Sequence, residues 1–403
     1  MKLTKPQKLV YDMEKFSGGS IATVCGSIVY NGQKEVEILQ KAANEIVKLN
    51  DALRIRISET ETGTEQYETE FKYEAFPVLT FETKEELTEY ATKFAKEPMD
   101  FYGSLCHINI ITSKDFYGIL VKLHHIISDA WTLSLIGNQF NALLNGEKPE
   151  AFSYFDYAIS ENEYIAGKRY QKDKVYFIDN FKKCDEVTYL SDKQSKSANT
   201  NRKTFVVDKN TTSKILKYAE SQNTSVFMVL MTALAVYINR IKMNKEKFYI
   251  GTAVLNRSDM QEKNTMGMFI NTIPMLIELD NDKTFEENLE NISNEGYAVL
   301  RHQKYNYGDI LKDLRQEFSF TEKLYDVIFS YQNASIEGES FETAWYSPGM
   351  QTESLQIHVD DRDNEGILNM HYDFQVEKFT EKEIERMHNH IFNLLCDAMS
   401  WFN

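Results

Sequence analysis

Three residues of this sequence have the types and the spacing to do chemistry: His124, His125 and Asp129, in the pattern His-His-x-x-x-Asp. Histidine titrates closest to neutral pH of all side chains, so a histidine that faces a cavity can accept or donate a proton during a reaction. The aspartate is expected to turn inward and pair with an arginine. The functional interpretation of the pattern is a site at which one histidine acts as general acid or base.

Two other interpretations stay open at this point. Adjacent histidines in an extended segment point to opposite sides, and although His125 and Asp129 could share a metal across one helical turn, no third ligand is suggested nearby. No metal is therefore predicted. Both histidines could also be hydrogen-bonded core residues, with Asp129 only capping a helix. Because the sequence has neither a G-x-S-x-G motif nor a P-loop, its chemistry would be a non-covalent, histidine-centred transfer.

The elements around these residues are predicted to present them at the rim of a sheet. Residues 116–123 form a nearly continuous apolar run, which is typical of a buried strand. From 130 to 144 apolar residues recur at helical spacing. Residues 53–57 alternate so that Arg54 and Arg56 share one strand face, and we expect Asp129 to pair with one of them.

Strands and helices are interspersed along both halves of the chain, which predicts an α+β fold class. The length of 403 residues suits two domains, and residues 182–203, with few large apolar side chains, are the predicted linker. The predicted domains are an N-terminal lobe of residues 1–181 and a C-terminal lobe of residues 204–403. The other predicted strands are 21–30, 105–112, 248–255, 273–279, 325–331, 355–360 and 366–374, and the other predicted helices are 34–49, 85–95, 154–164, 211–219, 225–241, 285–301, 308–317 and 381–401.

The composition excludes several classes of protein. A formal net charge of -16 argues against a surface that follows nucleic-acid phosphates. No apolar stretch reaches the roughly 18 residues of a membrane span, and residues 1–8 lack the apolar run that is typical of a signal peptide. The four cysteines are far apart and form no C-x-x-C pair. We therefore predict a cytoplasmic protein that binds neither nucleic acid nor membranes. We also expect it to be a monomer.

Six segments together resemble one known family. Residues 124–132 resemble the H-H-x-x-x-D-G-W-S motif of the condensation domains of nonribosomal peptide synthetases, which belong to the chloramphenicol acetyltransferase-like superfamily. With this segment, the other five occur along the chain in the same order as the motifs of the family. Residues 3–7 resemble L-T-x-x-Q, 50–54 resemble H-x-x-L-R, 154–158 resemble Y-x-D-Y-A, 266–272 resemble I-G-x-F-V-N-T, and 302–305 resemble H-Q-x-Y.

The resemblance implies a fold and a set of site residues. The fold would be two acetyltransferase-like lobes, α/β sandwiches, arranged as a V-shaped pseudodimer around a central tunnel. His125 matches the catalytic second histidine of the family, and His124 matches the first, which is structural. Asp129 matches the aspartate that pairs with the arginine of the H-x-x-L-R motif, here Arg54. Supporting positions in the matched motifs are Trp131, Asn271, which would face the tunnel, and Ala130, which stands where the family usually has glycine.

The resemblance also implies a reaction. A donor acyl thioester would be attacked by an acceptor aminoacyl amine, giving an amide, with the substrates on 4'-phosphopantetheine arms of carrier proteins or, for the donor, as acyl-coenzyme A. No cofactor would be bound by the domain itself. Donor and acceptor carrier proteins and a downstream adenylation domain are the expected partners. Because few residues precede the first motif, a first-module or free-standing enzyme is expected. The alternatives are an O-acyltransferase that esterifies a free alcohol, and a catalytically idle docking relative, which Ala130 keeps open.

Overall fold

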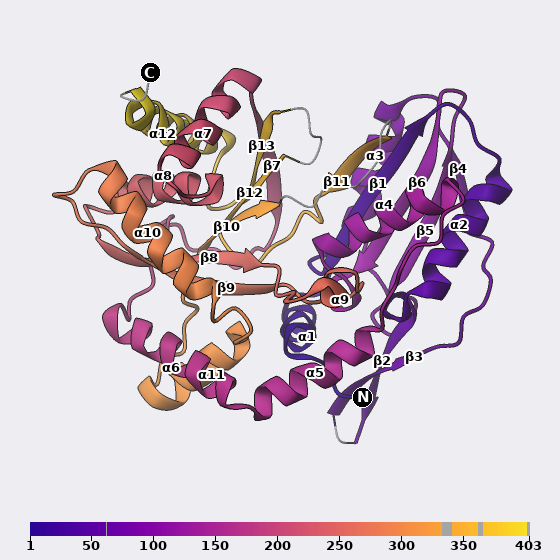
Figure 1. The fold of residues 1–403 in the computed structure, drawn as a ribbon, viewed down its shortest axis with the longest axis horizontal. Helices are drawn as coiled ribbons and strands as arrows, with labels where there is room; N and C mark the ends of the chain where they lie inside the picture. Colours follow the sequence, from indigo (N-terminus) through magenta and orange to yellow (C-terminus); the bar gives the residue numbers. More distant parts are fainter. Residues whose placement is uncertain (62, 333–340, 362–365, 401–403) are drawn as a thin grey trace. The chain divides into compact units, whose positions relative to one another are not determined.

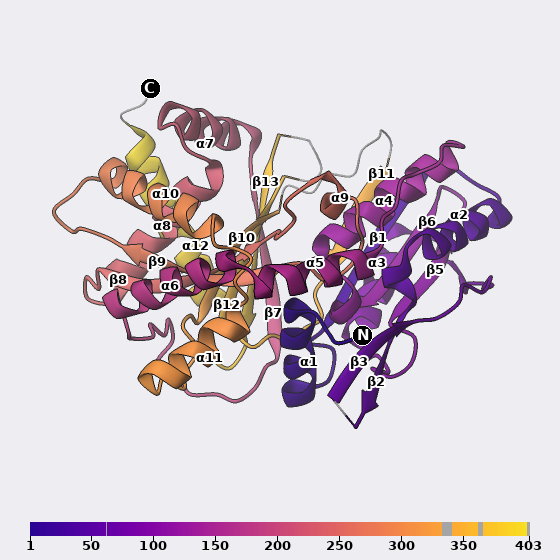
Figure 2. The same cartoon turned by 60° about the horizontal axis from the view of Figure 1, so that its bottom comes forward.

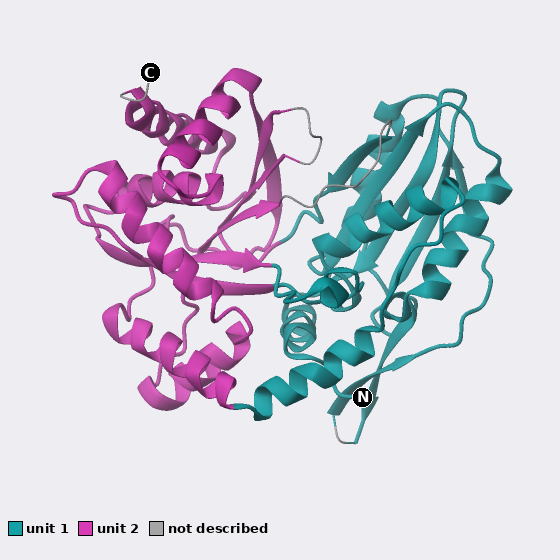
Figure 3. Cartoon of the chain, in the orientation of Figure 1, with its two compact units in different colours: residues 1–167, 255–270, 334–350 teal, residues 168–254, 271–333, 351–403 magenta. Residues whose placement is uncertain are grey.

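The computed structural model describes the chain except for residues 62, 333–340, 362–365 and 401–403 (Figure 1). The described residues form two compact units (Figure 3). Each unit combines a large β-sheet with packed helices (Figure 2), which confirms the predicted α+β class. Unit 1 consists of the described residues of Met1–Gly167, Leu255–Ile270 and Ala334–Met350, and unit 2 of those of Lys168–Val254, Asn271–Asn333 and Gln351–Asn403.

Unit 1 contains a five-stranded sheet in the order β11-β1-β6-β5-β4. Neighbouring strands in this sheet are antiparallel except for β4 and β5, which are parallel. The strands of this sheet are β1 (Thr23–Asn31), β4 (Val78–Thr80), β5 (Cys106–Thr112), β6 (Phe116–His124) and β11 (Phe341–Tyr346), and β2 (Ile55–Thr60) pairs separately with β3 (Gly63–Glu68). The helices are α1 (Lys5–Ser17), α2 (Val36–Leu49), α3 (Lys84–Lys96), α4 (Ala130–Leu144), α5 (Tyr154–Ala166) and α9 (Met260–Lys263), with 3-10 helices η1 (Asp51–Arg54) and η2 (His125–Ile127).

Strand β6 is buried on both faces, which explains its continuous apolar sequence. It lies between β1 and β5 in the middle of the sheet. Val121 belongs to a core that also contains Ile136 of α4, whereas Leu120 belongs to a second core that contains Leu87 of α3. Because successive side chains of a strand point to opposite faces, a strand between two helical layers has no polar face. The end of β6 is therefore held rigidly.

Unit 2 contains a six-stranded sheet in the order β7-β13-β12-β10-β8-β9. β10 is parallel to both of its neighbours, and the other pairs are antiparallel. The strands are β7 (Thr200–Val207), β8 (Lys247–Val254), β9 (Asn271–Glu278), β10 (Val327–Gln332), β12 (Leu355–Asp360) and β13 (Leu368–Gln375), and the helices are α6 (Lys168–Lys183), α7 (Lys209–Ser221), α8 (Val226–Ile241), α10 (Phe285–Leu300), α11 (Tyr307–Phe318) and α12 (Glu381–Met399).

Among the described residues no single helix is long and apolar enough to cross a membrane. Helices α7 and α8, bent by 98° to each other, meet the criteria of length and composition only as a pair.

The units do not follow the predicted boundaries at residues 181 and 204. Helix α6, most of which was assigned to the N-terminal lobe, belongs to unit 2, and so does the predicted linker 182–203, whose last residues begin strand β7. Residues 255–270 belong to unit 1 although β8 and β9, on either side of them, pair in unit 2. Strand β11 likewise pairs with β1 of unit 1. A composition shift locates a polar stretch, but it does not reveal which sheet a strand joins.

Candidate active site

The two histidines lie at the turn where β6 ends and α4 begins. β6 ends at His124, η2 spans His125–Ile127, and Asp129 is the N-cap of α4. The backbone N–H of His125 donates a hydrogen bond to the carbonyl of Ala22 at 2.6 Å, and the hydroxyl of Ser128 donates to the carbonyl of His124 at 3.0 Å. The predicted junction of strand and helix is present, and its backbone is fixed by hydrogen bonds.

His125 combines a partly exposed side chain with one buried ring nitrogen. Its Nδ1 is shielded from solvent and makes no hydrogen bond of regular geometry to the residues that the structure describes. Burial lowers the pKa of His125 because it disfavours the charged ring. The Asp129 carboxylate and the backbone groups of His125 and Ser128 favour the charged ring, but burial outweighs them. The ring is therefore neutral at neutral pH, which is the form that accepts a proton.

Asp129 is fully buried and binds a buried arginine. Nη1 of Arg257 donates to one carboxylate oxygen of Asp129 at 2.7 Å, and Nη2 donates to the other at 3.2 Å. The carboxylate also accepts hydrogen bonds from the backbone N–H of Thr132 at 2.9 Å and from that of Phe269 at 3.2 Å. Asp129 therefore caps α4 and neutralises Arg257 at once, so the capping interpretation and the ion-pair interpretation both hold.

The predicted pair of Asp129 and Arg54 is corrected by these contacts. Arg54 lies in η1 rather than on a strand, and its guanidinium donates to the carbonyls of Val47 and Lys48 in the last turn of α2 and pairs with Glu68. A cation is favourable at this end of a helix, where unpaired carbonyls concentrate negative charge. The alternation of residues 53–57 suggested a strand, but the first two of them close a 3-10 turn and only the last three belong to β2.

Arg257 is a site residue that the sequence reasoning missed. It follows β8 by three positions and lies 128 positions from Asp129 in the chain. The one signal in the sequence is an arginine in the polar segment Asn256–Ser258, directly after a strand of apolar residues. Such a segment reads as an exposed loop, so burial of its arginine cannot be predicted from the pattern.

Residues 255–270 are held against the start of α4 by further contacts. The indole N–H of Trp131 donates to the carbonyl of Lys263 at 2.7 Å. The backbone N–H of Gly267 donates to the Thr132 hydroxyl at 3.1 Å, and that hydroxyl lies 3.1 Å from the carbonyl of Gly267. Gly267 has φ of +144°, and a Cβ there would lie 2.1 Å from the Tyr154 ring. The position therefore requires glycine.

Ala130 fits its position without backbone strain. It is the first residue of α4, and it is not among the described residues that have positive φ. The glycine that the family usually has here is thus not needed for a left-handed backbone. The methyl group of Ala130 therefore introduces no positive-φ strain at the site.

Asn271 belongs to unit 2, where its side chain holds a loop. Its Nδ2 donates to the carbonyls of Gln303 and Tyr305, both at 2.9 Å. Its Oδ1 accepts from the backbone N–H of Tyr307 at 3.3 Å. Both amide hydrogens are used by the protein, so this side chain has no donor left for a substrate. The structure thus brings His124 and Asp129 close enough to act on the charge of His125, places Ala130 and Trp131 in the first turn of α4, and gives Arg54 and Asn271 other contacts.

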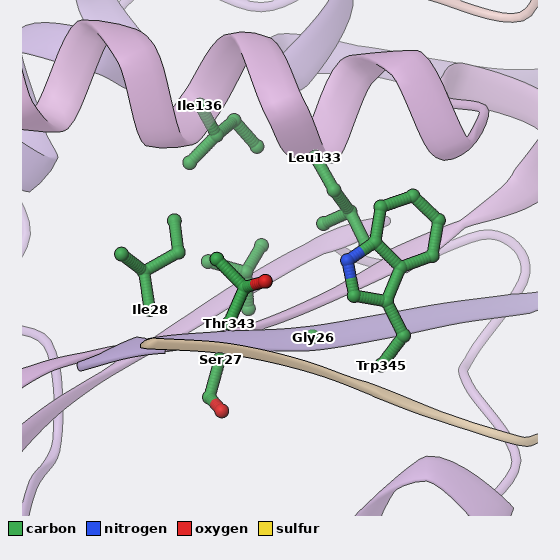
Figure 4. Close-up of a pocket in the computed structure, with 8 residues that line it drawn as sticks. Gly26, Ser27, Ile28, Leu133, Ile136, Thr343 and Trp345 are labelled. Atoms are coloured by element: carbon green, nitrogen blue, oxygen red, sulfur yellow. The ribbon is translucent and has the colours of Figure 1, made fainter. Parts of the chain in front are cut away.

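Unit 1 also contains a crevice between α4 and the sheet (Figure 4). Leu133 and Ile136 of α4 point toward the sheet, and the Ser27 hydroxyl points away from the crevice to Tyr346 at 2.9 Å. Its empty volume is about 250 Å³, which includes open solvent at its mouth, and the side chains that line it leave little room for water. The lining is almost wholly apolar and consists of Gly26, Ser27, Ile28, Val121, Leu133, Ile136, Thr343 and Trp345.

The crevice lies close to the histidine turn along β6. Gly26 of β1 pairs with Val121 of β6, three residues before His124. At about 3.3 Å per residue, the crevice begins roughly 10 Å from the turn.

Within the described part of the chain, no group of three or more histidine, cysteine, aspartate or glutamate side chains is arranged to hold a metal ion.

Comparisons with known proteins agree with the motifs. The family model of the condensation domain matches residues 1–401. Surfactin synthase subunit 1 of Bacillus subtilis (strain 168) and tyrocidine synthase 3 of Brevibacillus parabrevis are 28% and 22% identical to the chain over 98% of its length. The chain spans only 11% and 6% of these two relatives.

Solved structures share the fold over nearly the whole chain. The condensation domain of the monacolin K polyketide synthase matches with a TM-score of 0.87 at 16% identity, covering 99% of this chain and 97% of that one. A variant of the starter condensation domain of rhizomide synthetase, in complex with C8-CoA, matches with a TM-score of 0.85 at 16% identity, covering 99% of this chain and 94% of that one. The resemblance found in the sequence is confirmed, and the chain belongs to the condensation-domain family.

Proposed function

We propose that this chain forms an amide bond between a donor acyl thioester and an acceptor aminoacyl amine. The observation that supports this function most directly is His125, a neutral histidine fixed at the turn between β6 and α4 in a chain of this family. The donor and acceptor would arrive on the phosphopantetheine arms of carrier proteins, and the donor could instead arrive on coenzyme A.

The reaction requires a group that moves a proton from the attacking nitrogen. The amine adds to the thioester carbonyl and forms the C–N bond, and the C–S bond then breaks to release a thiol. In the proposed reaction the neutral ring of His125 has its proton on Nδ1, which leaves the lone pair on Nε2. In this proposal Nε2 accepts the proton from nitrogen and returns a proton to the departing sulfur. Holding the two substrates together supplies the rest of the acceleration.

A direct experiment gives the purified chain one acyl thioester donor and two acceptors in separate reactions. One acceptor is an aminoacyl thioester on a carrier protein, and the other is a free alcohol of similar size. Mass spectrometry of the products is expected to detect the amide. Ester formation without amide would favour the O-acyltransferase alternative. Absence of both products with several donors would favour the idle docking relative, against which the unstrained Ala130 argues.

We further propose that the donor is an aliphatic acyl chain that enters the crevice between α4 and the sheet. The apolar lining and the distance of roughly 10 Å from the turn suit such a chain, whose thioester would then lie near His125. A relative of the same fold was solved with C8-CoA. Because little of the crevice is open to water, Leu133 or Trp345 must move when a chain binds.

Enlarging the crevice is expected to change which donors are used. Leu133→Ala removes a lining side chain and should shift the optimum of kcat/KM toward longer acyl chains. The kcat/KM of the best donor should exceed that of the next donor roughly 10-fold, which is the discrimination that one to two methylenes give in an apolar pocket. Activity over a series of acyl-coenzyme A lengths measures this shift. Leu143→Ala, in the same helix but outside the lining, is the matched control. An unchanged length profile in Leu133→Ala would contradict the assignment of the crevice.

A further inference from the structure

We propose that Glu14 is a positioning residue for the histidine turn and that it acts through His124. This inference rests on the proposed role of His125 in the reaction. Glu14 lies in the last turn of α1, and its Oε2 is 3.5 Å from Nε2 of His124. Both side chains are largely buried, with 14% of Glu14 and 3% of His124 exposed.

The other ring nitrogen of His124 determines where its proton must lie. Nδ1 accepts a hydrogen bond from the backbone N–H of Ile126 at 3.1 Å. An imidazole nitrogen that accepts a hydrogen bond has no proton, so a neutral ring in this position must have its proton on Nε2. A doubly protonated ring would lose the bond to Ile126, because both of its nitrogens would be donors. His124 therefore needs one proton, on the nitrogen that faces Glu14.

The surroundings of that nitrogen make Glu14 the group that keeps the proton there. Nε2 of His124 and Oε2 of Glu14 are both shielded from solvent, neither has a hydrogen bond of regular geometry among the described residues, and the two atoms face each other at the ion-pair distance of 3.5 Å. The ring of Phe101 covers His124 edge-on, with 5.2 Å between the ring centroids. A buried N–H without an acceptor is unfavourable, and the Glu14 carboxylate is the acceptor within reach.

Helix α1 contacts the turn at both ends of His125. Glu14 faces the His124 ring, and the side-chain amide of Gln7 donates to the carbonyl of Ile126 at 3.0 Å. Gln7 and Glu14 are seven residues apart and lie on the same face of the helix. The backbone of His125 lies between these two contacts. If His124 took the other tautomer, two N–H groups would face each other at Ile126, and the turn that presents His125 would shift.

Two variants of Glu14 and one control test this role. Glu14→Leu removes the acceptor, and kcat for amide formation is expected to fall roughly 10-fold with little change in KM, as for other groups that orient a functional histidine. Glu14→Gln keeps an acceptor oxygen and should restore most of the activity. Asp12→Asn changes an exposed carboxylate of the same helix, which pairs with Lys8, and should leave kcat unchanged.

Ring-nitrogen NMR of His124 supplies a measurement that does not depend on the reaction. The unaltered protein is expected to have the Nε2–H tautomer, and Glu14→Leu a mixture of tautomers. A doubly protonated or Nδ1–H ring in the unaltered protein would overturn the proposal even if Glu14→Leu did not fold. Unchanged kcat in a folded Glu14→Leu would overturn it as well. An active His125→Ala variant would instead refute the proposed function and leave the tautomer result intact.

Discussion

The pair of Asp129 and Arg257 in unit 1 and the pair of Arg202 and Asp373 in unit 2 use the same chemistry in different surroundings. In unit 1 the side chains of Asp129 and Arg257 are both 0% exposed. In unit 2 Arg202 donates to both carboxylate oxygens of Asp373, at 2.8 and 2.7 Å, but 26% of the Arg202 side chain is exposed. The first pair ties α4 to residues 255–270, and the second joins the neighbouring strands β7 and β13. Burial, rather than geometry, distinguishes them.

This difference determines what the loss of one partner should cost. A fully buried charge that loses its partner cannot be solvated, and such losses typically cost about 3–5 kcal/mol. A charge that water can reach loses much less, because solvent replaces the partner. The pair at the histidine turn is therefore part of what keeps that turn in place, whereas the pair in unit 2 adds to a sheet that backbone hydrogen bonds already hold.

Removal of Arg257 is expected to have the largest effect on stability. Arg257→Met leaves the Asp129 carboxylate buried without its cation and should lower the free energy of unfolding by about 3–5 kcal/mol. Denaturant unfolding measures this loss. The double variant Asp129→Asn/Arg257→Met removes both charges and should recover part of it. A loss below about 1 kcal/mol, the range of an exposed pair, would remove the distinction between the two pairs.

Removal of Arg202 is expected to have a smaller effect on stability than removal of Arg257. Arg202→Met should lower the free energy of unfolding by roughly 1–2 kcal/mol, less than Arg257→Met, because solvent reaches the partly exposed Arg202 position and the Asp373 carboxylate that it leaves still has His358 at 3.6 Å. The same unfolding experiment, run beside Arg257→Met, measures the difference. If Arg202→Met cost as much as Arg257→Met, burial would not be the deciding factor.

The stability that the pair of Arg202 and Asp373 contributes should also depend on pH in a defined direction. Burial raises the pKa of Asp373, but Arg202, His358 and His371 outweigh it and lower that pKa below its ordinary value. A carboxyl with a lowered folded-state pKa contributes stability above its unfolded pKa of about 3.9 and loses it as the pH falls through the folded value. The stability difference between the unaltered protein and Arg202→Met should therefore be complete at neutral pH and shrink below about pH 4. A difference independent of pH would contradict this linkage.

The sequence predicted the turn well because local patterns determine it. The apolar run of β6 ends within one residue of its predicted end, and α4 spans the predicted residues 130–144. Both elements have strong periodicity, and Asp129 is a preferred N-cap residue. The motif match added the family and selected His125 over His124, a choice that spacing alone left open.

The partner of Asp129 and the division into units could not be predicted in the same way. Arg257 approaches Asp129 only because residues 255–270 leave the sheet of unit 2 and pack in unit 1. No local pattern records that path, and the nearer arginines on an apparent strand, Arg54 and Arg56, were the obvious candidates. Arg54 is instead used at the end of α2, where its charge meets the helix carbonyls. Long-range pairing of charged residues depends on the tertiary path of the chain.

Replacement of His125 tests most directly whether this residue moves the proton during amide formation, as we propose. The rate of amide formation from a donor thioester and a carrier-bound aminoacyl acceptor should fall by about 10²- to 10⁴-fold in His125→Ala. Unfolding of this variant should match that of the unaltered protein, and His390→Ala, at an exposed position of α12, should keep full activity. Turnover by His125→Ala close to that of the unaltered protein would contradict the account.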